Sequence, residues 1–414
     1  MLSRSAVRPD VGEPRFRDTL RGLPNRVWVI SLGGLILQIG TFLPVFLVLY
    51  LTQRGFSAGT AGLVLGVAGL SRVLGNVLGG YLTDTIGWRR SILLSVLATS
   101  ALTAIVPFLG WLPAILIVIA LMGVISQIYR PAMAAVVIDA VKNPQQRLAA
   151  FGVLRFAQNI GSAVGGVLGG VVATISYVGL FLAEAGTLLV FGVIVAILLR
   201  RSPEPAVEAK TAQKDEEPQG GTTTGYRQVL ADRTLRQFLL MTVFAMFVYI
   251  QTTVGLPLHV TEINLDESDF GLLMGLNGLL VVLLELPLIS VVSRYKPQNV
   301  LAVGNVFTGV GLTLTGFTSG LALLAVTVLI WTFGEMLYSS VAQAHLASLT
   351  PPGMVGRYQG LYGAAYTVGT GAGPVIGGAL YALAPEALWA LTGVLGLLSV
   401  FLCLRLQAPA LTAD

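Results

Sequence analysis

Charge and cysteine are scarce in this sequence. Only 11% of its 414 residues are Asp, Glu, Lys or Arg, whereas soluble domains carry about 25%. The single cysteine, Cys403, cannot form an internal disulfide and leaves no cysteine cluster for a metal. The pattern G-x-x-x-x-G-K-[ST] is also absent, which excludes ATP hydrolysis by a P-loop. We therefore expect a membrane protein that is not an enzyme and that holds no metal and no cofactor.

Long apolar runs make up most of the chain, and 55% of its residues are hydrophobic. A helix needs about 20 apolar residues to cross the hydrocarbon core of a bilayer. Such runs occur twelve times, in two groups of six: 27–50, 58–82, 91–108, 113–138, 148–173 and 178–199, then 235–258, 268–292, 299–317, 321–346, 357–382 and 387–405. The sequence therefore predicts an all-α membrane protein whose 12 transmembrane helices form two six-helix bundles.

Polar stretches mark the ends of the two bundles. The segment after the sixth run is rich in proline, glycine and charge, a composition typical of a flexible linker. The first 26 residues hold six arginines and no apolar core, so they do not resemble a cleavable signal peptide. The predicted divisions are an N-terminal arm (1–26), an N-terminal bundle (27–199), a linker (200–234), a C-terminal bundle (235–406) and a C-terminal tail (407–414).

Basic residues are distributed unequally between the two sets of loops. Of the 25 Lys and Arg, 21 lie in the arm, the loops after even-numbered runs, the linker and the tail, whereas one lies in the opposite loops. Since cytoplasmic loops carry the excess of basic residues, we expect a multi-pass protein of the cell inner (plasma) membrane with both termini in the cytoplasm. The net charge of +5 comes from these loops, so it does not indicate a nucleic-acid partner.

A short turn between the second and third runs carries the most specific motif. Residues 80–90 read G-x-L-x-D-x-x-G-x-R-R. This turn resembles the loop 2–3 signature of the major facilitator superfamily of secondary transporters, and the resemblance covers nearly the whole chain. In that family the carboxylate of the turn contacts the start of helix eleven, here near Arg357, and its basic residues meet an acid that ends helix four. The residues that match this gating motif are Gly80, Asp84, Gly87, Arg89, Arg90 and Asp139.

The resemblance implies two bundles that rock around a central site. A glycine pattern of the fifth run recurs in the eleventh run at an offset of 208 residues. The copy in the eleventh run contains a Gly-Pro step and is similar to a signature that the superfamily's 12-span drug/proton antiporters carry in helix five. Small residues at this spacing let helices approach closely in a membrane. The predicted helix-packing residues are Gly161, Gly165, Gly169, Gly373, Pro374 and Gly377.

Ionisable residues inside the apolar runs are costly, about 2.5–3.5 kcal/mol each on insertion scales, so they indicate function or buried ion pairs. Glu335 is the favoured proton carrier because its own run contains no basic residue. The repeat alignment places it at nearly the same depth as Arg130, which we expect to tune its proton affinity. Glu285 is a further candidate, for which a structural or interfacial role is equally open. For the arginines, a structural ion pair is the alternative.

The central cavity is expected to be mostly apolar and aromatic, which suits lipophilic substrates better than sugars. Its predicted lining is Gln38, Phe42, Gln127, Arg155, Asn159, Tyr249, Asn277, Phe333 and Tyr338. The leading hypothesis is a monomeric transporter that works by alternating access and exports amphipathic or drug-like small molecules, with the proton gradient as its energy source. A proton-coupled symporter of a polar metabolite is one alternative. A lipid-handling protein or a non-transporting receptor on the same fold is another. The expected partners are the small-molecule substrate, protons and the lipid bilayer.

Overall fold

The computed structural model describes residues 20–41, 47, 50–51, 53–56, 58–199 and 222–406. Every regular element in these ranges is a helix, and the ranges contain no strand. The predicted all-α class is therefore confirmed. Several predicted features lie outside the described residues, namely Phe42, most of the N-terminal arm, residues 200–221 and the tail 407–414. What the sequence predicts for these residues stays a prediction.

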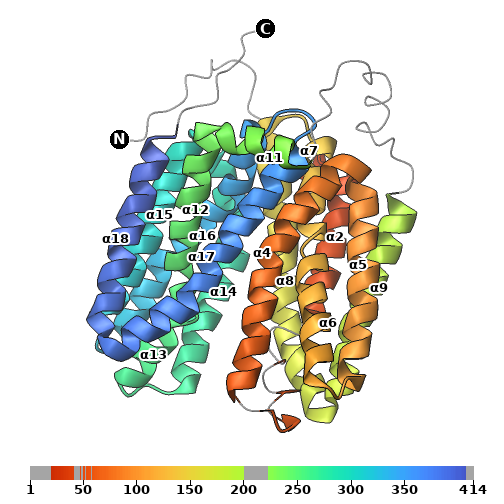
Figure 1. The fold of residues 1–414 in the computed structure, drawn as a ribbon. Coiled ribbons are helices and arrows are strands. Elements are labelled where there is room, and N and C mark those ends of the chain that lie inside the picture. The colour runs from red at the N-terminus through yellow and green to blue at the C-terminus, as the bar shows by residue number, and fades with distance from the viewer. Residues whose placement is uncertain are drawn as a thin grey trace.

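The helices form two groups that lie side by side (Figure 1). The first half of the chain contains α2 (Asn25–Ile39), α4 (Ala58–Ile86), α5 (Trp88–Ile105), η1 (Val106–Phe108), α6 (Leu112–Ile125), α7 (Tyr129–Ala140), α8 (Pro144–Ile175) and α9 (Tyr177–Leu198). The second half contains α12 (Arg233–Tyr249), η2 (Ile250–Thr252), α13 (Gly255–Glu262), α14 (Glu267–Val292), α15 (Pro297–Thr315), α16 (Leu321–Leu349), α17 (Val355–Leu383) and α18 (Pro385–Leu404). The short helix α11 (Thr222–Ala231) lies at one end of the molecule, and α13 lies at the opposite end. We call these the α11 end and the α13 end.

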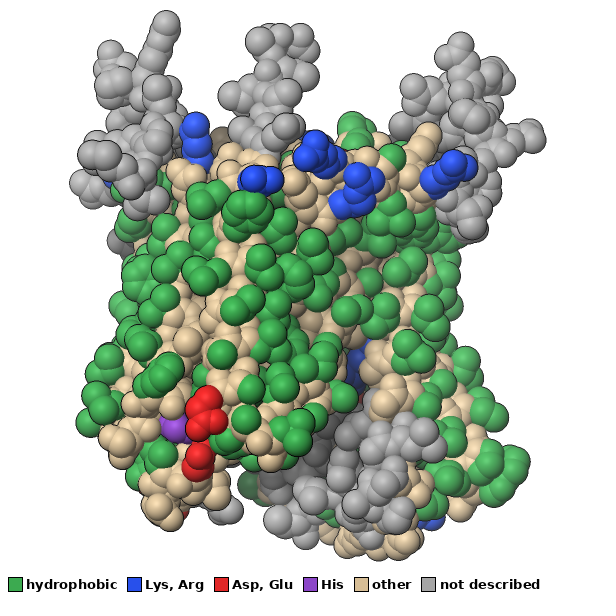
Figure 2. All heavy atoms as spheres, turned by 60° about the vertical axis from the view of Figure 1, so that its left-hand side comes forward, with side chains coloured by type: hydrophobic (Ala, Val, Ile, Leu, Met, Phe, Trp, Pro, Cys, Tyr) green, Lys and Arg blue, Asp and Glu red, His purple; other side chains and the backbone are tan. Residues whose placement is uncertain are grey.

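The surface of the described helices matches a membrane environment. Figure 2 shows an apolar band around one face, with Lys and Arg gathered at the α11 end. Seven described segments are long and apolar enough to cross a membrane: Trp88–Phe108, Leu112–Ala140, Tyr177–Leu198, Arg233–Glu262, Asp269–Val292, Leu321–Leu349 and Pro385–Leu404. Three other helices are as long as most of these segments but carry more glycine and polar residues, namely α4, α8 and α17 with 29, 32 and 29 residues. The count of twelve spans therefore stays a prediction.

Two of the predicted spans are interrupted within their length. The fourth run divides into α6 and α7 around a turn at 126–128. Pro131 lacks an N–H group, and its ring would clash with the carbonyl of residue 127 in a continuous helix. That carbonyl instead accepts a hydrogen bond from the backbone N–H of Arg130 at 3.2 Å. The seventh run is likewise divided into α12, η2 and α13. The sequence had predicted continuous helices at both places.

The glycine repeat lies where the helices of each half pack most closely. A Cβ atom on Gly165 of α8 would lie 2.6 Å from the carbonyl oxygen of Ile39 in α2. A Cβ atom on Gly369 of α17 would lie 2.6 Å from the carbonyl oxygen of Val243 in α12. Glycines of the repeated pattern thus bring α8 onto α2 and α17 onto α12, the first helix of each half.

The remaining predicted packing positions divide in two groups. Gly161, Gly373 and Gly377 also face backbone or side-chain atoms that leave no room for a methyl group, and Gly169 is buried in α8. Pro374 does not belong to this surface, which corrects the prediction. It lies inside α17 with its side chain exposed, because one helical step turns it about 100° away from Gly373.

The two halves meet through α4 and α17 at the α11 end (Figure 1). A Cβ atom on Gly360 of α17 would lie 3.0 Å from the Cα atom of Gly80 in α4. Gly356 and Gly80 are just as close, since a Cβ atom on Gly80 would lie 2.9 Å from the carbonyl carbon of Gly356. We call this contact the α4–α17 seam. It closes the molecule at the α11 end and leaves the central space between the halves behind it.

Candidate functional site

A cavity of about 370 Å³ lies between the two halves of the chain. Helices α2, α4, α7 and α8 line it from one half, and α12, α15, α16 and α17 line it from the other. Polar side chains form most of the lining. Its amide side chains are Gln38, Asn76, Gln158, Asn159, Asn305, Gln343 and Gln359, and its phenol side chains are Tyr129, Tyr249, Tyr338, Tyr362 and Tyr366.

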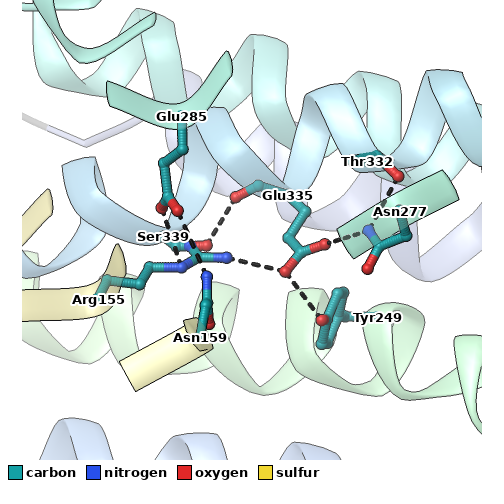
Figure 3. Close-up of polar contacts among 8 residues, drawn as sticks. All are labelled: Arg155, Asn159, Tyr249, Asn277, Glu285, Thr332, Glu335 and Ser339. Atoms are coloured by element: carbon teal, nitrogen blue, oxygen red, sulfur yellow. Dashed lines mark hydrogen bonds and ion pairs between the residues drawn. The ribbon is translucent and has the colours of Figure 1, made fainter. Parts of the chain in front are cut away.

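Arg155 of α8 joins two glutamates of the opposite half at this cavity (Figure 3). Its Nε atom lies 3.1 Å from Oε1 of Glu285 on α14. Its Nη2 atom lies 2.8 Å from Oε1 of Glu335 on α16. We call these three residues the Arg155 cluster. Because α8 belongs to one half and α14 and α16 belong to the other, the cluster forms two ion pairs across the interface between the halves.

The carboxylate of Glu335 accepts hydrogen bonds from three side chains. Besides Arg155, the hydroxyl of Tyr249 on α12 donates to Oε1 at 2.9 Å, and Nδ2 of Asn277 on α14 donates to Oε2 at 3.0 Å. Asn277 is itself held by Thr332, whose Oγ1 lies 3.0 Å from the same nitrogen. The Glu335 side chain is 10% exposed and lines the cavity. It is therefore held firmly but stays within reach of the cavity.

Glu285 lies behind Glu335, in a more enclosed place. Its side chain is fully buried, and it is not part of the cavity lining. Nδ2 of Asn159 donates to its Oε2 at 3.3 Å, which adds to the ion pair with Arg155. Of the two carboxylates, only that of Glu335 therefore lines the cavity.

The charges of the Arg155 cluster do not balance when both carboxylates are ionised. Two carboxylates and one guanidinium then give a formal charge of −1, and one bound proton makes the cluster neutral. Burial opposes an uncompensated charge.

The predicted partner of Glu335 is wrong. We expected Arg130, but Arg155 occupies that place. The repeat alignment gives equal depth in the membrane, whereas contact depends on which helices adjoin, and α8 packs directly against α16. Arg130 lines the cavity from the start of α7. For Arg155 the structural alternative, an ion pair, is what the structure shows.

The other predicted lining residues fall into two groups. Gln38, Arg155, Asn159, Tyr249 and Tyr338 line the cavity, and Asn277 reaches it through Glu335. Gln127 and Phe333 do not belong to the lining. Gln127 is buried in the turn before α7, where its Nε2 donates to Ser126 at 3.3 Å. Phe333 packs edge-on against Phe307, with ring centroids 5.1 Å apart.

The cavity carries more hydrogen-bonding side chains than the sequence led us to expect. The amides and phenols that the sequence analysis missed repeat at helical spacing. Ser339 and Gln343 follow Glu335 at intervals of four on α16, and Gln359, Tyr362 and Tyr366 share a face of α17. Residues three and four apart lie on one side of a helix. A search of the apolar runs for polar residues at this spacing would have found these faces.

A second polar cluster lies at the α4–α17 seam. Oδ1 of Asp84 accepts a hydrogen bond from the backbone N–H of Gly356 at 2.6 Å, and its Oδ2 accepts one from the backbone N–H of Arg357 at 3.0 Å. Nη1 of Arg357 lies 3.6 Å from the same Oδ2. Asp84 is 8% exposed. The carboxylate thus satisfies free N–H groups at the start of α17, where the helix dipole favours a negative charge.

The rest of the gating motif shapes the turn between α4 and α5. Gly87 has φ of +87°, a backbone conformation that favours glycine. Arg89 donates from Nη2 to the carbonyl oxygen of Ala196 on α9 at 3.0 Å, Arg90 is exposed, and Asp139 lies in the last turn of α7. The contact between Asp84 and the start of α17, which the motif implies, is present. Its role in gating stays a prediction.

Helix α11 adds a contact to this seam that the sequence did not indicate. The hydroxyl of Tyr226 on α11 donates to the carbonyl oxygen of Val77 on α4. Asp232, which directly follows α11 and caps α12, accepts a hydrogen bond from the hydroxyl of Tyr358 on α17 at 3.0 Å. Burial, assisted by the nearby Asp84, raises the pKa of Tyr226 well above its ordinary value, so the phenol stays a neutral donor. The helix therefore bridges α4 and α17.

Comparisons with known proteins agree with this architecture. A family model described as Major Facilitator Superfamily matches residues 30–266 and 238–413. The chain is 24% identical over 385 residues to the Na(+), Li(+), K(+)/H(+) antiporter of Planococcus maritimus, covering 85% of this chain and 88% of that protein. It is 24% identical over 383 residues to the multidrug resistance protein MdtH of Aeromonas salmonicida, covering 91% and 94%.

A solved structure shows the same fold. The crystal structure of a bacterial homologue of the iron transporter ferroportin, in an outward-facing state, superposes with a TM-score of 0.74 at 16% sequence identity. The match covers 92% of this chain and 99% of the other. At this level of identity the likeness concerns the arrangement of helices.

Proposed function

The chain belongs to the major facilitator superfamily of transporters, and from that premise we propose that it is a secondary transporter driven by protons. The Arg155 cluster supports this proposal most directly. It places one carboxylate and one arginine at the cavity and a second carboxylate behind them, and the three groups come from both halves. A rocking motion that separates α8 from α16 would remove the guanidinium from Glu335 and change its affinity for a proton. Proton binding and the direction of access are thereby linked.

For the substrate, we propose export of amphipathic, drug-like molecules that also carry hydrogen-bonding groups. The names of two relatives, a multidrug resistance protein and a cation/proton antiporter, support export and proton coupling. A second candidate is proton-coupled symport of a polar metabolite. The amides and phenols of the lining favour it, since polar ligands need several such partners.

Transport into proteoliposomes tests the proposal. We expect an imposed pH gradient to drive accumulation of at least one amphipathic compound from a panel of dyes, and dissipation of the gradient to abolish it. Accumulation of polar metabolites alone would favour the second candidate. Transport that does not depend on the pH gradient for any compound of the panel would contradict proton coupling.

We propose that the α11 end faces the cytoplasm of the plasma membrane, because the basic residues gather there (Figure 2). Cys403 is buried, and Cys403→Ser provides a background without other thiols. In that background we expect an impermeant maleimide to label Ser319→Cys, at the α13 end, on intact cells. Pro352→Cys, in the loop between α16 and α17, should react only after the membrane is opened. The reverse pattern would invert the topology.

A further inference from the structure

We infer that the central cavity binds organic anions, and that Arg130 recognises their negatively charged group. The inference rests on the proposed transport function and names its substrate class. The molecules that would fit the cavity carry a carboxylate or sulfonate on an aromatic or apolar body. Arginine suits such groups because its planar guanidinium can donate two parallel hydrogen bonds to them.

Arg130 is an uncommitted cation at the cavity. It lines the cavity from the first turn of α7, and its side chain is exposed there. Among the described residues, no carboxylate or carbonyl accepts a hydrogen bond from its guanidinium, and only its backbone N–H is bonded, to Gln127. The break before Pro131 sets this position, since a continuous helix would turn the side chain elsewhere. An arginine held at a cavity without a partner is ready to pair with an anion that enters.

The other charged groups of the lining are already paired. Glu335 receives hydrogen bonds from Arg155, Tyr249 and Asn277. Arg155 is shared between Glu335 and Glu285. Within the described lining, the cavity therefore offers a free cation and no free carboxylate. A cationic substrate would meet repulsion from Arg130 and would find no uncommitted negative group.

A second arginine strengthens the positive field beside Arg130. Arg72 on α4 lies close enough to repel it, while Glu184 offsets part of the Arg72 charge. Figure 2 shows blue, the colour of Lys and Arg, inside the recess between the halves. Low-dielectric walls concentrate such a field in a cleft. The field therefore favours anions over cations.

The remaining lining can hold the body of such an anion. Met133, Phe151 and Leu154 add apolar surface to the same cavity, and Tyr129 and Gln158 add hydrogen-bond donors. An aromatic body with one acidic group would thus find both parts of its surface matched. A small hydrophilic anion would use only the polar part.

A matched ligand series tests the inference. The purified full-length protein is titrated with 2-naphthoate, 2-naphthamide and 2-naphthylmethylamine, and the rise of Tm with ligand concentration gives each Kd. We expect the acid to bind about ten- to hundredfold more tightly than the amide, the range of one charge-assisted hydrogen bond. Arg130→Gln should abolish this preference, and Arg130→Lys should keep most of it. Arg405→Gln serves as a control, because Arg405 stacks on Phe401 outside the cavity.

Equal binding of the acid and the amide by the wild-type protein would overturn the inference, and so would a preserved preference in Arg130→Gln. A failure of the transport proposal would give a different set of results. In that case the acid would still bind through Arg130, but no compound would accumulate in proteoliposomes under a pH gradient. Proton-driven transport confined to neutral or cationic compounds would instead contradict the anion inference and leave the transport proposal standing.

Discussion

Replacing Glu335 by glutamine is expected to abolish accumulation driven by a pH gradient while downhill exchange of substrate continues. Glutamine keeps the size of the side chain and can still accept a hydrogen bond from Tyr249, but it cannot bind and release a proton. The fold should survive, because Arg155 retains Glu285 at 3.1 Å and the buried charges then balance. Accumulation in proteoliposomes under an imposed gradient, beside counterflow without a gradient, measures the two activities separately.

The matched variant is Glu285→Gln, which also leaves Arg155 with one carboxylate. We expect a milder loss, because Glu285 is fully buried and Glu335 still lines the cavity. The double variant leaves Arg155 without a carboxylate and should be destabilised by about 3–5 kcal/mol, the cost of breaking a buried ion pair. Full gradient-driven uptake by Glu335→Gln would show that Glu335 is structural.

The contrast between Glu335 and its partner shows how far the sequence could predict the site. Glu335 stood out because an acid in an apolar run without a basic residue must find a partner elsewhere. The identity of that partner depends on which faces of two distant helices meet. Hydropathy and repeat offset report depth along the membrane but not rotation about the helix axis. Arg155 was therefore named only as a lining residue, and Arg130 was assigned the wrong contact.

The fold was predictable to a similar extent. Run lengths and the glycine repeat predicted the all-α class, because a bilayer demands helices of a certain length and small residues where helices cross. The break at 126–128 and the division of the seventh run before α13 were missed. Proline is tolerated inside membrane helices when neighbours satisfy the freed carbonyl, so its presence in a run does not say whether the helix bends, breaks or continues. That choice determines where Arg130 lies.

Asp84→Asn is expected to open the α4–α17 seam. Asp84 accepts two backbone hydrogen bonds at the start of α17 and lies 3.6 Å from the Arg357 guanidinium. An asparagine retains one acceptor, but its amide nitrogen would face a second N–H donor. Hydrogen bonds to charged groups contribute about 1.5–3 kcal/mol each. Loss of one such contact would shift the balance between the two facing states about 10- to 150-fold toward opening at the α11 end, because each 1.4 kcal/mol is a factor of ten.

Cysteine accessibility in everted vesicles, whose α11 end would face the medium, measures this shift. Gln343 lines the cavity on the side of α16 that leads from Glu335 toward the seam, so Gln343→Cys in the Cys403→Ser background should label slowly while the seam is closed. Adding Asp84→Asn should raise its labelling rate at least tenfold and reduce transport, while expression and Tm change little. Thr85→Val is the control, since the Thr85 hydroxyl donates to carbonyl oxygens of its own helix, those of Tyr81 and Leu82. An unchanged labelling rate with normal transport would mean that Asp84 caps α17 without holding the two halves together.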